Sequence, residues 1–189
     1  MDRLVERMQV AGCSGLRVVT RPEKEDVIRN ARRHHATVVK ARPDTLAASL
    51  LEGISGLDRD EVVLIGFPDS IWDPVDGYRP LVERVRGVFE VALGLFETSD
   101  VEPPHIVETD PDGTVTEVEA RPGSPPPHLI WGCVAARVSS LSGLDPKGHP
   151  TDHFRALSRS GTVAGVRLSD RYVDIGTRVG LRRALALWG

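Results

Sequence analysis

The chain has 189 residues, of which 40% are hydrophobic and 27% are charged, and its formal net charge is −3 with neutral histidines. This length favours one domain over residues 1–189, and this composition excludes a largely disordered chain. The net negative charge argues against a nucleic-acid-binding protein, and two cysteines are too few for a disulfide framework or a four-ligand zinc site. No apolar run is long enough to span a membrane, so we expect a cytoplasmic protein with neither nucleic-acid nor membrane partners.

The first third of the chain alternates between helical and extended patterns. Apolar residues recur at helical spacing before Gly12, which is typical of a helix end. The run 61–66 is continuously apolar, which predicts a strand buried on both faces, as in a parallel sheet. The expected elements are a helix over 1–11, a strand over 16–20, a helix from Pro22 to 35, a strand over 37–39, a helix from Asp44 or Thr45 to Leu51 and a strand over 61–66. This alternation favours an α/β fold.

The rest of the chain predicts a hairpin, further strands and three helices. Asp110-Pro111-Asp112-Gly113 separates two alternating runs, which is the turn signal of a β-hairpin inserted into the fold. Thr151 and Thr177 are expected to cap helices. The expected elements are a helix after Asp76 and before the run 89–96, hairpin strands over 106–109 and 115–119, a strand over 128–138, a helix from Thr151, a strand over 163–168 and a helix from Thr177.

Two aspartates stand next to predicted strands and are candidates for chemistry. Asp69 follows the strand 61–66, at the end where open α/β sheets bind ligands, although an aspartate there can also serve only its own loop. Asp174 lies among apolar residues, where a carboxylate must be paired, hydrogen-bonded or metal-bound; it can also simply accept backbone N–H groups of the last helix. Two carboxylates that share one Mg²⁺ have oxygens within ~4.2 Å of each other, but spacing along the chain does not show that these two meet.

Five segments occur in the order ARPDTLAASL, LIGFPDSIWDP, IVETDPDGTVTEVEARP, HLIWGC and YVDIGT. In this order they resemble the sugar-phosphate nucleotidyltransferases, or sugar-nucleotide pyrophosphorylases, over nearly the whole chain. The resemblance implies a Rossmann-like mixed sheet flanked by helices, with an inserted β-hairpin. The residues that it implicates are Asp69 and Asp174 as Mg²⁺ ligands, Arg121 as the sugar-phosphate-binding base, Pro43, Asp44, Thr45 and Leu46 as contacts of the nucleotide base, and Gly132 as part of the sugar pocket.

The resemblance implies an enzyme that joins a sugar 1-phosphate to a nucleoside triphosphate and releases pyrophosphate. Asp69, Arg121 and Asp174 would be its catalytic residues, because such chemistry rests on positioning and charge neutralisation. Ala120 stands where the family has an acid, and His105 stands where it has a small residue, so the resemblance does not define the identity of the sugar. The alternative is a non-catalytic nucleotide-binding or assembly protein derived from the family.

One feature of the family has no counterpart in this sequence. The family begins with a strand and a glycine-rich loop that binds the triphosphate, whereas this sequence begins in the helix that follows. We therefore expect a sheet without its first strand, between 16–20 and 61–66, and weak or absent turnover. Either the flanking strands close up, or a partner chain supplies a strand, as in a homo-oligomer, or about two dozen upstream residues are lacking.

Overall fold

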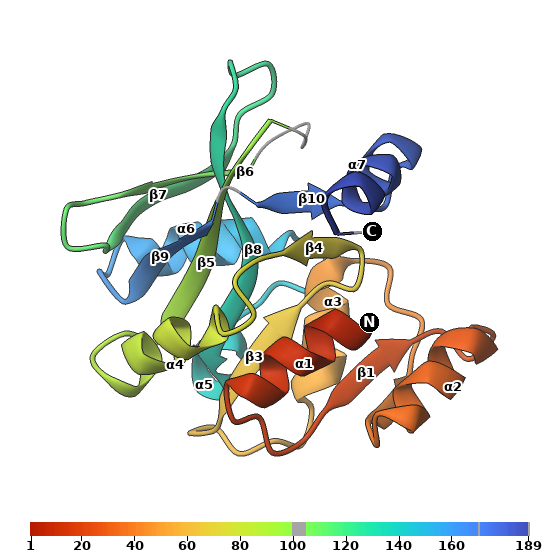
Figure 1. The fold of residues 1–189 in the computed structure, drawn as a ribbon. Helices are drawn as coiled ribbons and strands as arrows, with labels where there is room; N and C mark the ends of the chain where they lie inside the picture. The colour runs from red at the N-terminus through yellow and green to blue at the C-terminus, as the bar shows by residue number, and fades with distance from the viewer. Residues whose placement is uncertain (100–104, 170, 189) are drawn as a thin grey trace.

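The computed structural model describes residues 1–99, 105–169 and 171–188. Helices and strands alternate over the first third of the chain, as the sequence predicts (Figure 1). The helices are α1 (Asp2–Val10), α2 (Glu25–Arg33), α3 (Leu46–Ile54), α4 (Tyr78–Arg86), α5 (Val138–Leu141), α6 (Pro150–Ser158) and α7 (Arg178–Trp188). The strands are β1 (Arg17–Thr20), β2 (Thr37–Lys40), β3 (Val62–Gly66), β4 (Ser70–Trp72), β5 (Val91–Thr98), β6 (His105–Thr109), β7 (Val115–Ala120), β8 (His128–Arg137), β9 (Val163–Ser169) and β10 (Tyr172–Asp174). None of the helices in these ranges is long and apolar enough to cross a membrane.

The central sheet has six strands and is built around β8. Strand β5 pairs antiparallel with one edge of β8, and β9 runs parallel to β5 on its far side. The other edge of β8 is shared, because β3 pairs with residues 133–137 and β6 meets Ile130. Strand β7 pairs with β6, which confirms the predicted hairpin.

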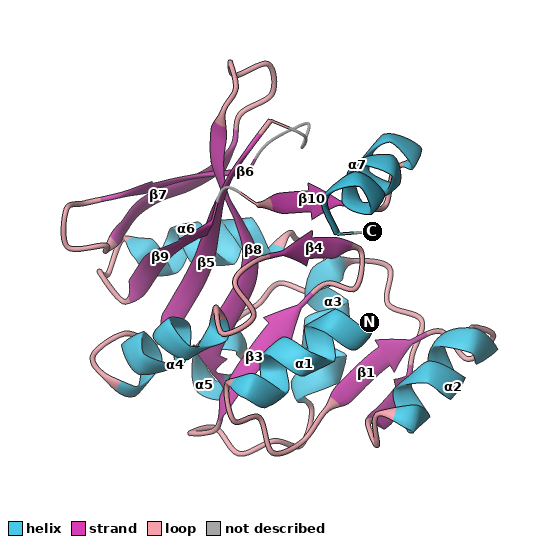
Figure 2. Cartoon of the chain, in the orientation of Figure 1, coloured by secondary structure: helices cyan, strands magenta, loops and turns pink. Residues whose placement is uncertain are grey.

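Helices cover both faces of this sheet (Figure 2). One core lies between the sheet and α3, α5 and α6, and a second core lies on the side of α1 and α4. Neighbouring residues of β5 point into different cores, since Leu93 belongs to the first and Ala92 to the second, and both are fully buried. The mixed α/β architecture predicted from the sequence is confirmed.

The pairing of β3 differs from the prediction. Its continuous apolar run predicted parallel neighbours, but β3 pairs antiparallel with β8 and with no other strand in the described ranges. The run is apolar because helices cover both of its faces: Val62 and Leu64 pack toward the α1–α4 core, and Val63 and Ile65 toward the other. A strand at the end of a sheet can therefore look central in sequence when helices bury both of its faces.

Strands β1 and β2 form a separate parallel pair beyond β3 (Figure 1). Helix α3 is linked to β1 by Arg17, whose Nη1 donates to the carbonyls of Gly53 at 3.2 Å and Ser55 at 2.7 Å. Strands β1 and β3 do not pair within the part of the chain that the structure covers. The prediction that these two flanking strands pair with each other is therefore wrong. The other two alternatives, a strand supplied by a partner chain and an additional upstream segment, stay predictions.

Candidate active site

A short ladder between β4 and β10 brings Asp69 and Asp174 close together. The two strands pair antiparallel with Asp174 opposite Ser70, and the N–H of Ile175 donates to the carbonyl of Asp69 at 2.7 Å. The two aspartates, more than a hundred residues apart in sequence, therefore lie on adjacent segments. The sequence does not predict this ladder, because strands of three residues are too short to show a periodic pattern.

Tyr172 connects the two carboxylates electrostatically. Burial of its ring raises the pKa of the Tyr172 phenol, and the negative charges of Asp174 and Asp69 raise this pKa further. The negative charges of both carboxylates therefore act on the same phenol. Asp69 is exposed and Asp174 is half-buried, so both remain accessible to a ligand from solvent. A cavity of about 210 Å³ adjoins this point, lined by Arg3 and Leu4 of α1 and by residues that flank Asp69.

The turn before α7 fixes the carboxylate of Asp174. Its Oδ1 accepts the N–H of Gly176 at 2.7 Å, a hydrogen bond from the turn and not from the last helix, which begins only at Arg178. Helix α7 then starts so close to the Asp174 carbonyl that a side chain at Gly180 would collide with it. The hydroxyl of Thr177 accepts the N–H of Gly180 at 3.0 Å, which confirms Thr177 as the cap of this helix.

The carboxylates of Asp69 and Asp174 suit a magnesium ion better than a structural metal site. Over the described residues, no three or more His, Cys, Asp or Glu side chains gather as a set of metal ligands. Mg²⁺ is commonly held by one or two carboxylates, with substrate phosphates and water completing its shell. Asp69 and Asp174 fit that pattern, and their role as ligands stays a prediction.

Asp73, directly after β4, anchors this region to both ends of the chain. Its carboxylate pairs with Arg7 of α1 at 3.3 Å and accepts the indole N–H of Trp188 in α7 at 3.0 Å. Arg7 is buried with 4% exposure and lies over the Trp72 ring, 4.8 Å from its centroid, and it also donates to the Trp72 carbonyl. Burial lowers the pKa of Arg7 and Asp73 opposes this shift, so the guanidinium stays charged. Nothing in the helical pattern of 1–11 marked Arg7 as buried.

Arg121 lies at the end of the β6–β7 hairpin and is already engaged by carboxylates. Its Nη1 donates to Glu108 at 2.6 Å, and its Nε donates to Glu119. Hydrogen bonds to these two groups raise the pKa of Arg121, and its bond in turn lowers the pKa of Glu119. Glu119 also binds Arg155 of α6 at 2.8 Å. The alternation of Glu117, Glu119 and Arg121 on one face of a strand is a signal that could have revealed this network.

The candidate nucleotide contacts lie at the start of α3. Thr45 caps this helix, as predicted, because its hydroxyl accepts the N–H of Ala48 at 3.0 Å. The same hydroxyl donates to the carbonyl of Pro146 at 2.6 Å, which ties α3 to the loop before α6. Leu46 packs against the core, Pro43 is half-buried and Asp44 is exposed. Of these side chains, Asp44 is the most open to a ligand.

Gly132 of β8 lies beneath two aromatic rings. A Cβ atom at this position would lie 2.6 Å from the ring of Tyr172 and 3.0 Å from that of Phe96. Only a glycine therefore allows these rings to rest on the backbone of β8. Gly132 thus lies against a residue of the β4–β10 ladder, whereas Arg121 and Thr45 are bound to other partners at the hairpin and at the loop before α6.

A stacked pair of histidines was not recognised in the sequence. The rings of His105 and His149 lie parallel with centroids 4.4 Å apart, and Thr151 bridges to His105 Nδ1 at 3.0 Å. His149, not Thr151, caps α6, because its Nδ1 accepts the N–H of Thr151 at 3.2 Å. The prediction of Thr151 as the cap is wrong because Pro150 is the first residue of the helix, and Thr151 instead accepts the indole N–H of Trp131.

Comparison with known proteins identifies the fold. No protein-family model and no curated protein sequence matches the chain. Solved structures do match, and they define the class: the chain has the fold of the sugar-phosphate nucleotidyltransferases.

Three solved structures represent this class. A protein assigned as a glucose-1-phosphate thymidylyltransferase from Bacillus anthracis, solved with sucrose, matches with a TM-score of 0.81 and 19% identity, over 98% of this chain and 80% of the other. A UDP-glucose pyrophosphorylase with bound UDP-glucose matches with a TM-score of 0.79 and 14% identity, over 98% and 84%. HddC from Yersinia pseudotuberculosis matches with a TM-score of 0.74 and 14% identity, over 99% and 84%. At these identities the likeness establishes the fold.

Proposed function

We propose that the protein transfers a nucleotide from a nucleoside triphosphate to a sugar 1-phosphate, with release of pyrophosphate. The observation that carries this proposal is the β4–β10 ladder, which holds Asp69 and Asp174 on adjacent segments of a fold shared with nucleotide-sugar enzymes. The partners are the two substrates, and the proposed location is the cytoplasm.

The chain's own residues would hold the substrates in place. Asp69 and Asp174 would bind Mg²⁺, which supplies charge neutralisation at the phosphate under attack. Arg121 would hold the sugar phosphate, since a guanidinium binds phosphate with two parallel hydrogen bonds. Because Glu108 and Glu119 occupy this guanidinium, the phosphate would have to compete with them.

The two remaining groups of candidates would recognise the organic parts of the substrates. Pro43, Asp44, Thr45 and Leu46 would contact the nucleotide base, with Asp44 as the exposed acceptor. Gly132 would contribute to the sugar pocket by keeping the Tyr172 ring close to β8. The identities of the base and of the sugar would follow from assays with a panel of substrates.

The test is pyrophosphate release from a panel of nucleoside triphosphates and sugar 1-phosphates, with and without Mg²⁺. Asp69→Ala and Asp174→Ala should each lower turnover by roughly 10²–10³-fold, since each removes charge at the reacting phosphate. Asp112→Ala is the matched control, because this exposed aspartate lies in the hairpin turn. Turnover that survives both aspartate substitutions would refute the proposal.

A second candidate is a non-catalytic nucleotide-binding or assembly protein. Two observations favour it: Arg121 is already paired with two glutamates, and the Thr45 hydroxyl is already bound to Pro146. This candidate predicts that a nucleotide raises the melting temperature while no substrate pair releases pyrophosphate. A nucleotide that changes neither quantity would count against both candidates.

A further inference from the structure

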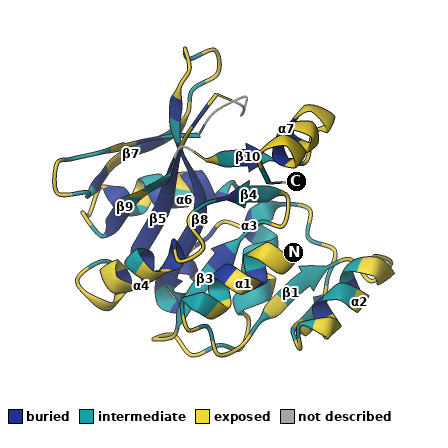
Figure 3. Ribbon diagram, in the orientation of Figure 1, coloured by how far each residue is buried: buried dark blue, intermediate teal, exposed yellow. Residues whose placement is uncertain are grey.

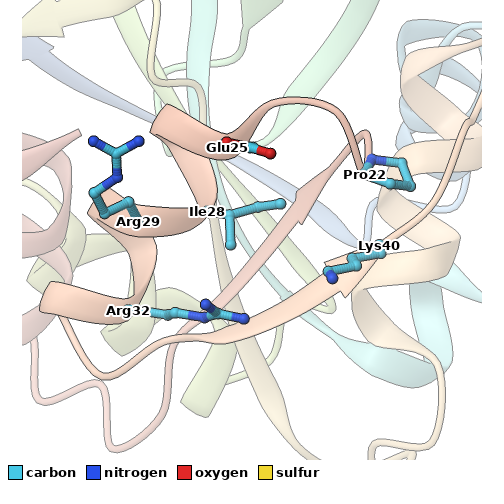
Figure 4. Close-up of a pocket in the computed structure, with 6 residues that line it drawn as sticks. All are labelled: Pro22, Glu25, Ile28, Arg29, Arg32 and Lys40. Carbon is cyan, nitrogen blue, oxygen red and sulfur yellow. The ribbon is translucent and has the colours of Figure 1, made fainter.

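A cavity of about 340 Å³ lies between α2 and the end of β2 (Figure 4). Helix α2 supplies most of its wall, and β2 closes it through Lys40. The lining residues are Pro22, Glu25, Ile28, Arg29, Arg32 and Lys40. None of them belongs to the proposed transferase site, although Lys40 is only three residues before Pro43.

The cavity carries an excess of positive charge. Three of its side chains are cationic and one is a carboxylate, and across the described residues none of these four forms an ion pair. The nearby Arg42, by contrast, is paired with Glu23 at 2.9 Å. Residues 17–42 contain eight arginines and lysines against three aspartates and glutamates, a net charge of +5 in a chain of net charge −3. The positive charge is thus concentrated around this cavity.

Two of the cations face each other across the cavity. Figure 4 shows the guanidinium of Arg32 and the ammonium of Lys40 pointing toward one another from α2 and β2. Like charges that converge with no carboxylate between them repel, and an anion between them removes this repulsion. A phosphate group suits the position, because arginine and lysine both bind phosphate through charge-assisted hydrogen bonds.

The rest of the cavity suits an organic body attached to that phosphate. Ile28 lies in the middle of the view in Figure 4 with 7% of its surface exposed, and with the exposed Pro22 it forms a small apolar part of the wall. Glu25 lies at the opposite rim from Arg32 and can accept a hydrogen bond from a hydroxyl group. An inorganic anion would leave the apolar surface and Glu25 unused.

We propose that this cavity binds a small phosphorylated organic molecule that carries hydroxyl groups. The phosphate lies between Arg32 and Lys40, the carbon skeleton rests on Ile28 and Pro22, and Glu25 accepts a hydroxyl proton in a hydrogen bond. This site is separate from the proposed transferase site and does not depend on it.

The test is isothermal titration of the full chain with glucose 1-phosphate, inorganic phosphate and unmodified glucose. Every titration is done in an Arg121→Gln background, so that a sugar phosphate held at the proposed transferase site is not counted. Glucose 1-phosphate should bind most tightly, inorganic phosphate more weakly and glucose not at all. Arg32→Gln combined with Lys40→Gln should weaken glucose 1-phosphate binding by about tenfold or more, because two charge-assisted hydrogen bonds are lost.

The matched control is Arg33→Gln, which removes a charge from the same helix at an exposed position that does not line the cavity. Glu25→Gln should weaken the binding of glucose 1-phosphate and leave the binding of inorganic phosphate unchanged. If Arg33→Gln weakened glucose 1-phosphate binding as much as the Arg32 and Lys40 substitutions, the effect would come from the overall charge of the helix, and the proposal would be overturned. A failure of glucose 1-phosphate to bind would overturn it as well, as would tighter binding of a short single-stranded RNA, which would mark a nucleic-acid surface instead. Arg32 and Lys40 are both exposed, so circular dichroism should show these variants folded.

Discussion

The sheet around β8 and the β1–β2 pair are buried to very different degrees (Figure 3). Residues 91–96 of β5 are all buried, whereas every residue of β1 and β2 is half-buried or exposed. The β1–β2 pair, with α2, is held to the rest of the molecule by α3 and by α1, whose Asp2 binds Asn30 of α2 at 3.3 Å and His34, directly after α2, at 2.8 Å. The central sheet therefore carries most of the stability, and the β1–β2 layer is free to open locally.

Equivalent leucine substitutions in the two regions test this comparison most strongly. Leu93→Ala should lower the free energy of unfolding by about 2–5 kcal/mol, because Leu93 is fully buried in the core. Leu16→Ala, next to β1, should cost only about 1 kcal/mol, because this side chain is half-buried. Urea unfolding measures both changes. Equal losses would show that the two regions form one uniform core.

Removing Asp73 tests how the ends of the chain are fastened to the candidate site. Asp73→Ala should cost about 3 kcal/mol, because it deprives buried Arg7 of its carboxylate and Trp188 of its acceptor. Asp73→Asn keeps an acceptor and should cost less. Amide exchange should rise in α1 and α7 more than in β5, whereas a uniform rise would show that Asp73 is not a local anchor.

Elements could be predicted from the sequence where the local residue pattern agrees with the burial in the structure. The hairpin of β6 and β7 follows from the turn at 110–113, and Thr45 and Thr177 are caps, as their position before apolar stretches indicates. The order of five short segments was enough to indicate the fold, which the solved structures share.

What the sequence could not predict depends on contacts between distant segments. The β4–β10 ladder joins residues about a hundred positions apart, and three residues are too few to show a period. Arg7 can be buried because it donates a hydrogen bond to the Trp72 carbonyl and pairs with Asp73, and neither partner is near it in sequence. The antiparallel partner of β3 was missed for the same reason, because helices on both faces produce an apolar run whatever the strand direction.

The smallest expected effect is a dependence of stability on pH that arises beside the central sheet and not in the β1–β2 layer. Burial lowers the pKa of His105 and of His149, the proximity of His149 lowers that of His105 further, and Asp152 partly opposes both shifts. Since these groups take up protons less readily in the folded state, the unfolded chain binds more protons as the pH falls through about 6.5. The stability should therefore be complete at pH 7.5 and should decrease toward pH 5.5.

His149→Asn separates this titration from the other roles of the residue. Asparagine can still accept the N–H of Thr151 at the start of α6, so the cap is retained while the titratable ring is lost. His105 then no longer stacks on a second imidazole, and its own pKa should return toward its ordinary value. Urea midpoints of this variant should change less between pH 7.5 and 5.5 than those of the unmodified protein. An unchanged difference would mean that other groups, and not this pair, make the sheet sensitive to acid.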